Sequence, residues 1–229
     1  MKNYLLTILG LLLFVAIAIA FFFLLREIIY TPSIVLTSQE CEPPCWKGIQ
    51  PGVTSAAETT NTLFEIEGIN VDSISVITGT TSGDIEQINW SFITPVRDLS
   101  GSVYLADQRV SVITLFTINS LKLSAVFDRF GEPELIWLEV ELSKYREILE
   151  IYYIYPATGL LIESVIDLKA GTSQVEIKEN TQVYRVAYFN PDKYNELLDS
   201  RILIRRPLHA RKNNPQPWAG FGVYQFTRE

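Results

Sequence analysis

The chain has 229 residues, of which 48% are apolar and 20% are charged, values typical of one globular domain with an added hydrophobic segment. The span from Glu40 to Ser200 contains 11 Lys or Arg residues and 24 Asp or Glu residues, so its net charge is 11 − 24 = −13. Because nucleic-acid binding depends on neutralising phosphates, this charge argues against a nucleic-acid partner.

An uncharged apolar run near the start of the chain, Tyr4 to Leu25, predicts a transmembrane signal anchor within residues 1–30. Its 22 residues span roughly 33 Å as a helix, which is enough for a bilayer core of roughly 30 Å. A cleaved signal peptide is the alternative, with small residues before a cut at Ala16, Ala18 and Ala20. The run is longer than a signal-peptide core and ends in Phe and Leu residues, which favours a retained anchor with the lipid bilayer as partner.

The charges beside this run indicate its orientation. Lys2 precedes it, and Arg26, offset by Glu27, follows it, so the positive-inside rule separates the two sides by a narrow margin. We expect a single-pass protein of the cell membrane, with a cytoplasmic amino terminus and an extracytoplasmic C-terminal domain, because a bulky domain follows a signal anchor across the bilayer. Pro32 ends the predicted helix, and residues 31–45 are predicted to be a tether.

Both cysteines lie in the segment CEPPCWKGIQPGVTS, residues 41–55. Their close spacing predicts a disulfide between Cys41 and Cys45, as expected in an oxidising compartment. The chain must bend between them, because the Cα atoms of a disulfide lie within about 7 Å of each other. We expect this disulfide to fix the exit of the tether and to seat Trp46 on the domain.

A metal or thiol-redox site is the alternative interpretation of the cysteine pair. Two thiolates from Cys41 and Cys45 and the imidazole of His209 suit Cu(I). This set resembles the copper-chaperone and thiol-reductase proteins of the cytochrome-oxidase assembly type, which have one membrane helix, a Cys-x-x-x-Cys pair and a distant His. However, the residues after Cys45 form a turn rather than a helix, and His209 lies in the cationic stretch RRPLHARK, where charge repulsion disfavours a metal.

Residues 46–229 are predicted to form one α+β domain of two helix-plus-antiparallel-meander units, about 46–117 and 118–200, with a basic segment at 201–229. The first unit opens with a helix at Ser55, where Ser55 and Glu58 fit a capping box, and the helix stops at Gly68. Alternation of period two predicts strands at residues 71–78, 84–93, 101–106 and 108–117. Residues 106–109 are predicted to be a hairpin turn.

The second unit opens with a helix that we expect to begin after Asn119, a favoured N-cap, and to end at Gly131. Residues 156–159 are predicted to be a turn between two strands. The predicted strands of this unit are residues 134–142, 147–155, 160–168 and 181–189. A last short strand is expected within residues 218–226.

Three short motifs are similar to known envelope proteins. The stretches GIQPGVTSAAETTNTLFEIEG and LSAVFDRFGEPELIWLEV resemble the helix openings and helix-to-strand steps of small outer-membrane assembly lipoproteins and of β-lactamase-inhibitor-protein-like modules. The stretch CEPPCWKGIQPGVT resembles uncharacterised membrane-anchored envelope proteins with a Cys-x-x-Pro-Cys-Trp-x-Gly-Ile-x-Pro-Gly-x-Thr segment. The resemblance implies helices packed on one face of an antiparallel sheet and a protein-binding role.

Several strand residues are candidates for a site. Paired carboxylates can act as acid and base in hydrolysis, but alternate strand positions also fit a solvated face. The candidate carboxylates are Glu139, Glu141, Glu147, Glu150 and Glu163. The aromatic residues Trp90, Trp137, Tyr152, Tyr153 and Tyr155 fit core and cross-strand pairs, and an exposed stripe of them is the alternative, as a carbohydrate or peptide platform.

The basic C-terminal segment is a candidate for contact with an anionic partner. Residues 201–229 contain 6 basic residues and 1 acidic residue, a net charge of +5. The cations expected to meet lipid headgroups or an acidic partner are Arg205, Arg206, Arg211 and Lys212. Contact with the acidic body of the same chain explains them equally well.

These observations predict a membrane-anchored extracytoplasmic protein that is a non-catalytic binding or assembly module with an envelope protein partner. No catalytic residue and no cofactor is assigned, because nucleophile–base pairs in most hydrolases need a His and His209 is the only one. The alternatives are a thiol-redox or copper-handling protein that uses Cys41 and Cys45, and a carboxylate-based hydrolase.

Overall fold

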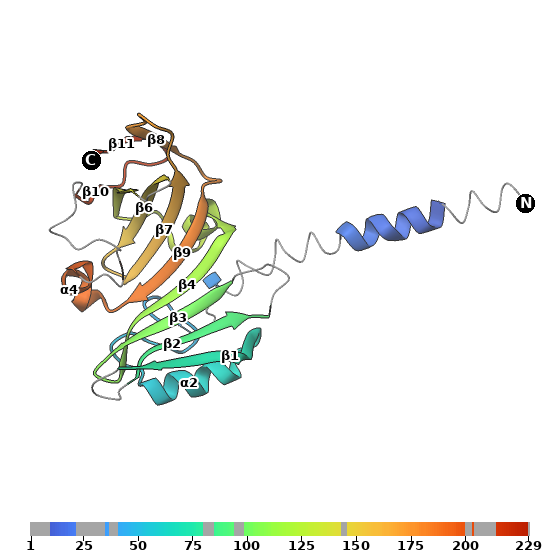
Figure 1. Cartoon of the computed structure of the whole chain (residues 1–229), viewed down its shortest axis with the longest axis vertical. Coiled ribbons are helices and arrows are strands. Elements are labelled where there is room, and N and C mark those ends of the chain that lie inside the picture. Colours follow the sequence, from blue (N-terminus) through green and yellow to red (C-terminus); the bar gives the residue numbers. More distant parts are fainter. Residues whose placement is uncertain are drawn as a thin grey trace, which may run out of the picture.

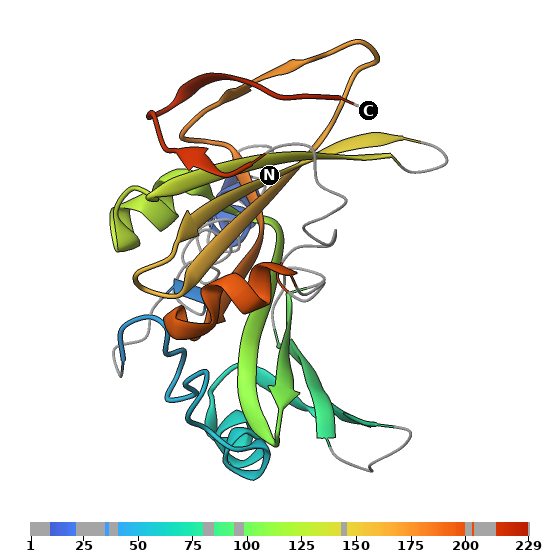
Figure 2. The same ribbon diagram turned by 90° about the vertical axis from the view of Figure 1, so that its left-hand side faces the viewer.

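The computed structural model describes residues 10–21, 35–36, 41–79, 85–93, 99–142, 146–199, 203 and 214–228 (Figures 1 and 2). These residues form an α+β fold, which confirms the predicted class. Its main element is a nine-stranded antiparallel sheet with the order β1-β2-β3-β4-β9-β7-β6-β5-β10. A separate two-stranded sheet pairs β8 with β11.

The strands follow the sequence pattern closely. Those of the first half are β1 (Ile69–Thr78), β2 (Ile85–Phe92), β3 (Ser100–Ala106) and β4 (Arg109–Lys122). Those of the second half are β5 (Leu135–Leu142), β6 (Glu147–Tyr155), β7 (Leu160–Asp167) and β9 (Gln182–Phe189). The short strands are β8 (Gln174–Ile177), β10 (Gln216–Pro217) and β11 (Gly222–Gln225). β1 to β4 lie in chain order along one half of the sheet, and β4 pairs with β9, so the last strands of both halves meet in the middle.

The first helix, α2 (Ala56–Glu65), has the predicted capping box. The Ser55 hydroxyl accepts from the backbone N–H of Glu58, and the Ser55 N–H donates to the Glu58 carboxylate at 2.8 Å. The pKa of Glu58 is lowered because its carboxylate accepts hydrogen bonds from both the backbone N–H and the hydroxyl of Ser55. The chain turns out of the helix before β1, and Gly68 adopts a positive φ of 90°.

The second helix, α3 (Leu123–Phe130), begins later than predicted. Asn119 and Leu121 belong to β4 instead, and Lys122 is the N-cap residue without a side-chain cap. The reason is tertiary: after a register shift that follows Phe116, β9 pairs again with the end of β4, where Leu121 lies opposite Val183, and this pairing overrides the local helix signal.

Apolar clusters cover both faces of the sheet, because neighbouring strand residues point to opposite faces. Ile113 of β4 belongs to the larger cluster, and Val112 beside it belongs to the smaller one. α2 and α3 add Leu63 and Val126 to the larger cluster. A short 3-10 turn, η1 (Pro191–Lys193), leads into α4 (Tyr194–Asp199), and α4 adds Leu197 to the smaller cluster on the opposite face.

The N-terminal part of the chain contains a helix at residues 10–21, which stands apart from the sheet in Figure 1. Within the part of the chain that the structure describes, no helix combines the length and the apolar character needed to cross a membrane. Residues 4–9 and 22–25 of the predicted anchor lie outside the described residues. Val35 and Leu36, inside the predicted tether, are buried in the larger apolar cluster.

Candidate functional site

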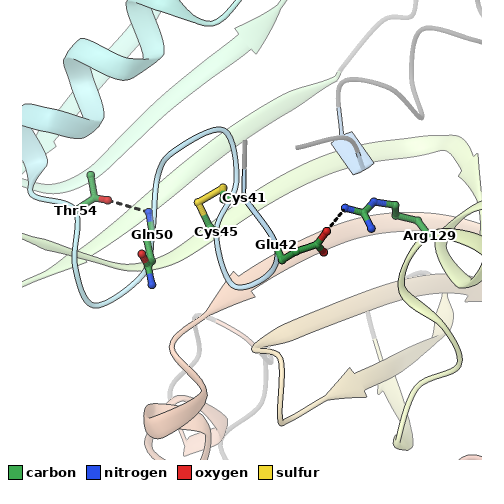
Figure 3. Close-up of a disulfide and its surroundings, with 6 residues drawn as sticks. All are labelled: Cys41, Glu42, Cys45, Gln50, Thr54 and Arg129. Atoms are coloured by element: carbon green, nitrogen blue, oxygen red, sulfur yellow. Dashed lines mark hydrogen bonds and ion pairs between the residues drawn. A yellow bond between two sulfur atoms is a disulfide. The ribbon is translucent and has the colours of Figure 1, made fainter. Parts of the chain in front are cut away.

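The cysteine segment forms a disulfide-closed turn (Figure 3). The structure contains the Cys41–Cys45 disulfide, with the two Cα atoms 5.6 Å apart. The backbone N–H of Cys45 donates to the Glu42 carbonyl at 3.1 Å, and the peptide between Pro43 and Pro44 is cis. The Glu42 carboxylate contacts the guanidinium of Arg129 on α3 at 3.0 Å, so this turn is linked to the second half of the chain.

The residues that follow the disulfide pack into the core of the domain. Trp46 and Ile49 exchange two backbone hydrogen bonds of 2.9 Å, and both side chains are fully buried. The Trp46 ring stacks on Trp90 of β2, with 5.7 Å between the ring centroids. Trp90 in turn needs Gly101 of β3, because a Cβ there would lie 2.1 Å from its ring. The cysteine segment therefore has a structural role, and Trp46 packs into the core of the domain as predicted. We call the Cys41–Cys45 disulfide, the buried Trp46 and the Glu42–Arg129 ion pair the fastening.

The cysteine pair does not present thiolates in this structure, because the two sulfurs are bonded to each other. His209, the third ligand of the copper alternative, lies outside the described residues. Among the residues that the structure describes, no group of three or more His, Cys, Asp or Glu side chains is placed to hold a metal ion.

A second candidate region is a set of charged side chains on the face of the sheet that α4 covers. Glu139 of β5 lies opposite Glu150 of β6, and Glu163 of β7 lies opposite both Tyr152 of β6 and Arg185 of β9. Side chains at such paired positions have Cβ atoms about 4.5–5.5 Å apart. All four charged residues are at most 6% exposed. We call these five residues the buried charge cluster.

The contacts in the buried charge cluster are short. The Arg185 Nε lies 2.5 Å from Oε2 of Glu163, and its Nη2 donates to the Leu203 carbonyl at 2.5 Å. The Tyr152 hydroxyl donates to Oε2 of Glu150 at 2.5 Å. Burial, and then the charges of Glu163 and Glu150, raise the pKa of Tyr152 well above its ordinary value, so its phenol stays protonated and continues to donate.

The interpretation of these carboxylates as a solvated face is wrong for Glu139, Glu150 and Glu163. The physical reason is that β5, β6, β7 and β9 are covered on both faces, and β6 is buried at every position after Glu147. Glu141 and Glu147 are half-buried, and Glu147 contacts Arg228 near the end of the chain. An acid–base pair that attacks a substrate needs access, whereas Glu150 and Glu163 are enclosed and already engaged by Tyr152 and Arg185.

The cations predicted to contact an anionic partner, Arg205, Arg206, Arg211 and Lys212, lie outside the described residues. Leu203, near the start of the basic segment, is described. Its side chain is fully buried in the smaller apolar cluster, and its carbonyl accepts from Arg185. The basic segment therefore begins in contact with the buried charge cluster.

Sequence reasoning missed Arg185 and the role of Tyr152. A signal for Arg185 was present, because it is the single charge in the strand QVYRVAYF and its period-two neighbours Val183 and Ala187 are apolar. A cation at such a position needs a buried anion. The partner, Glu163, is far away in sequence, so no local pattern connects the two residues.

The predicted aromatic core is present. Trp90, Trp137, Tyr152, Tyr153 and Tyr155 are all buried, so they do not form an exposed platform. The surface has two other features. One is a shallow hollow of about 470 Å³ between the β8 strand and Phe221, and the other is the outer edge of β1.

Comparisons with known proteins add no identification: no family model, no curated protein and no solved structure matches the chain. The class that the structure itself defines is an α+β protein with a disulfide-fastened N-terminal segment. The resemblances drawn from the short motifs therefore stay predictions.

Proposed function

We propose that this chain is a single-pass membrane protein whose α+β domain is a non-catalytic binding or assembly module on the extracytoplasmic side of the cell membrane. The observation that carries the proposal is that an exposed apolar helix precedes a domain whose N-terminal segment is attached to its core by the fastening. The helix supplies attachment, and the fastening joins the chain that follows the helix to the core of the domain.

The apolar helix supports the attachment. Its eight large apolar side chains between Leu11 and Phe21 are 46–69% exposed. Each such side chain gains roughly 1.5–3 kcal/mol when it moves from water to an apolar medium. The uncharged sequence continues on both sides of this helix, from residue 4 to residue 25, which fits a bilayer better than an aqueous surface.

The fastening supports a role in which the domain is held for contact with a partner. The Cys41–Cys45 disulfide, the buried Trp46 and the Glu42–Arg129 ion pair connect the end of the predicted tether, and the residue after it, to both halves of the domain. A disulfide at this point also fits an oxidising compartment, since thiols of cytosolic proteins are kept reduced.

The domain's architecture supports binding rather than hydrolysis. We assign two helix-plus-meander units, α2 with β1 to β4 and α3 with β5, β6, β7 and β9, joined where β4 pairs with β9. Three of the five candidate carboxylates, Glu139, Glu150 and Glu163, are buried between these covered layers. Arg185 already contacts Glu163, and Tyr152 already contacts Glu150. The edge of the sheet at β1 lies at the surface instead, and strand edges are common protein contacts.

Membrane partition and topology test the proposal. The full chain should stay in the membrane pellet after an alkaline carbonate wash, and protease added from outside should digest the domain. The double variant Leu13→Arg with Ile17→Arg should leave the pellet, because each Arg at the centre of a span costs roughly 2.5–3.5 kcal/mol. Val53→Arg, an exposed apolar position of the domain, is the matched control and should partition like the wild type. Recovery of the wild-type chain in the carbonate supernatant would overturn the proposal.

A further inference from the structure

The two edges of the nine-stranded sheet are built differently. At one edge, β10 has only two residues, and Pro217 is one of them. Short edge strands and prolines are the usual protection against pairing with another chain. At the other edge, β1 has ten residues and contains no proline and no lysine. Among the residues that the structure describes, β1 has a neighbouring strand on one side only, so its outer edge offers backbone donors and acceptors.

The pairing of β1 with β2 is irregular in the first half of β1 and again between Ile77 and Thr78, and it is regular from Ser75 to Ile77. Between Asn70 and Ser75 the register with β2 shifts, and the hydroxyl of Ser73 fills the gap. It donates to the Asn70 carbonyl at 2.6 Å and accepts from the Ser91 N–H at 2.8 Å. From Ser75 to Ile77 the pairing with β2 is continuous, so this stretch is available for a further strand.

The regular stretch of β1, from Ser75 to Ile77, has apolar side chains on both faces. Val76 lies opposite Ile88, on the face of the larger apolar cluster, and Ile77 lies opposite Gln87, on the other face. Ile88 is fully buried, but Val76 and Ile77 are 45% and 47% exposed. The larger apolar cluster includes Ile69 at the start of β1 but leaves Val76 and Ile77 partly uncovered, so an added strand would bury apolar surface on both faces of this stretch.

The surroundings of this edge are acidic. From residue 48 to residue 96 the sequence has six Asp or Glu residues and no Lys or Arg, a charge of −6. Glu65, Glu67, Asp72 and Glu86, all close to β1 in the chain, are exposed. Two copies of this edge would repel each other, whereas a strand with cationic side chains would be attracted.

We infer that the edge of β1 binds an extended segment of a partner protein in which Lys or Arg residues alternate with apolar residues. The segment adds as a tenth strand next to Ser75, Val76 and Ile77, where backbone hydrogen bonds give affinity and its alternate apolar side chains contact Val76 or Ile77. This inference rests on the proposed binding role and names the surface and the partner chemistry for it.

Peptide binding to the full chain in detergent micelles tests the inference. The probe is a fluorescent peptide of alternating Val and Lys with about the length of β1, followed by anisotropy. Matched peptides carry Glu in place of Lys, or Pro in place of the central Val residues. We expect the Val–Lys peptide to bind at least about tenfold more tightly than either, because the first lacks charge complementarity and the second lacks backbone donors.

Matched variants locate the site. Ile77→Lys and Val223→Lys make the same change of charge at exposed strand positions of β1 and β11. Ile77→Lys should weaken binding of the Val–Lys peptide by about tenfold, and Val223→Lys should change it less than about twofold. Circular dichroism checks that both variants are folded.

Three results would overturn the inference. One is equal binding of the Lys, Glu and Pro peptides, and another is an equal effect of the two variants. The third is a dimer of the peptide-free chain that Ile77→Lys dissociates, because the occupant of the edge would then be a second copy. None of these results bears on the carbonate partition, so failure of the anchor proposal and failure of this one are separable.

Discussion

Removal of the Arg185 guanidinium is expected to be one of the most costly single changes in the domain. In the Arg185→Met variant, Glu163 keeps its buried position without the cation that lies 2.5 Å away. The two side chains are 7% and 0% exposed, so solvent screens this ion pair very little. Breaking a buried pair by removal of one partner costs about 3–5 kcal/mol, because the remaining charge is uncompensated. That is a large fraction of a typical domain stability of about 5–15 kcal/mol.

A double-mutant cycle separates the pair from the packing around it. Replacing both residues, in Glu163→Met with Arg185→Met, removes the two charges together and should restore most of the loss, to within about 1–2 kcal/mol of the wild type. Urea unfolding followed by Trp fluorescence measures all three variants. Arg146→Met is the matched control, because its ion pair with Asp167 is 3.5 Å long and its side chains are 66% and 75% exposed. It should not change stability measurably.

The result that refutes this reasoning is a double variant that is as unstable as the sum of the single variants. The buried charge cluster would then act through packing volume rather than through charge compensation. A loss below about 1 kcal/mol for Arg185→Met alone would equally show that Glu163 finds another counter-charge.

Three further predictions concern the fastening and the core. Trp46→Ala should cost about 3–5 kcal/mol in urea unfolding, because a fully buried indole stacked on Trp90 leaves a cavity. Replacing both Cys41 and Cys45 by Ala should cost less, about 2 kcal/mol, because so short a loop removes little chain entropy from the unfolded state. Above pH 10 the domain should lose stability, up to about 1.4 kcal/mol per pH unit for each buried tyrosine. Burial raises the folded-state pKa of Tyr152, Tyr153, Tyr155 and Tyr188.

The sign of the alkaline effect follows from the direction of the pKa shifts. A phenol with a raised pKa in the folded state stabilises the fold fully below the unfolded pKa of about 10, and this contribution is lost as the pH rises through and above that value. Absorbance at 295 nm should show four tyrosines that ionise only on unfolding. Ionisation of all tyrosines near pH 10 in the folded chain would contradict the prediction. For the fastening, a double Cys variant less stable than Trp46→Ala would contradict the expected order.

Thiol chemistry decides between the structural disulfide and the copper alternative. Without reductant, alkylation of the full chain should label neither Cys41 nor Cys45, because the two are bonded in the structure. After mild reduction and Cu(I) addition, His209→Ala should bind copper as the wild type does if His209 is not a ligand. A loss of copper binding in that variant alone would support the metal site.

Much of the local structure could be predicted from the sequence. The capping box of Ser55 and Glu58 involves groups three residues apart, and the turns at residues 106–109 and 156–159 lie between strands that alternate with period two. The Cys41–Cys45 disulfide joins neighbours as well. In each case the interacting groups are close in sequence, so the residue types themselves define the contact.

Only the tertiary structure decided the longer-range features. The pairing of β4 with β9 turned Asn119 from a predicted helix cap into a strand residue, and the strand β8 and the helix α4 were not predicted at all. Local propensities differ by less than about 1 kcal/mol per residue, so strand pairing and burial override them.

The difference between local contacts, which the sequence predicts, and long-range contacts, which it does not, applies to the candidate sites as well. The period-two positions of Glu139, Glu150 and Glu163 placed them on one face of their strands, but their burial depends on a helix and a segment that lie later in the chain. Arg185 meets Glu163 only because β7 and β9 are neighbours in the sheet. A sequence pattern specifies which way a side chain points, whereas what covers that side chain is determined by residues that the pattern does not contain.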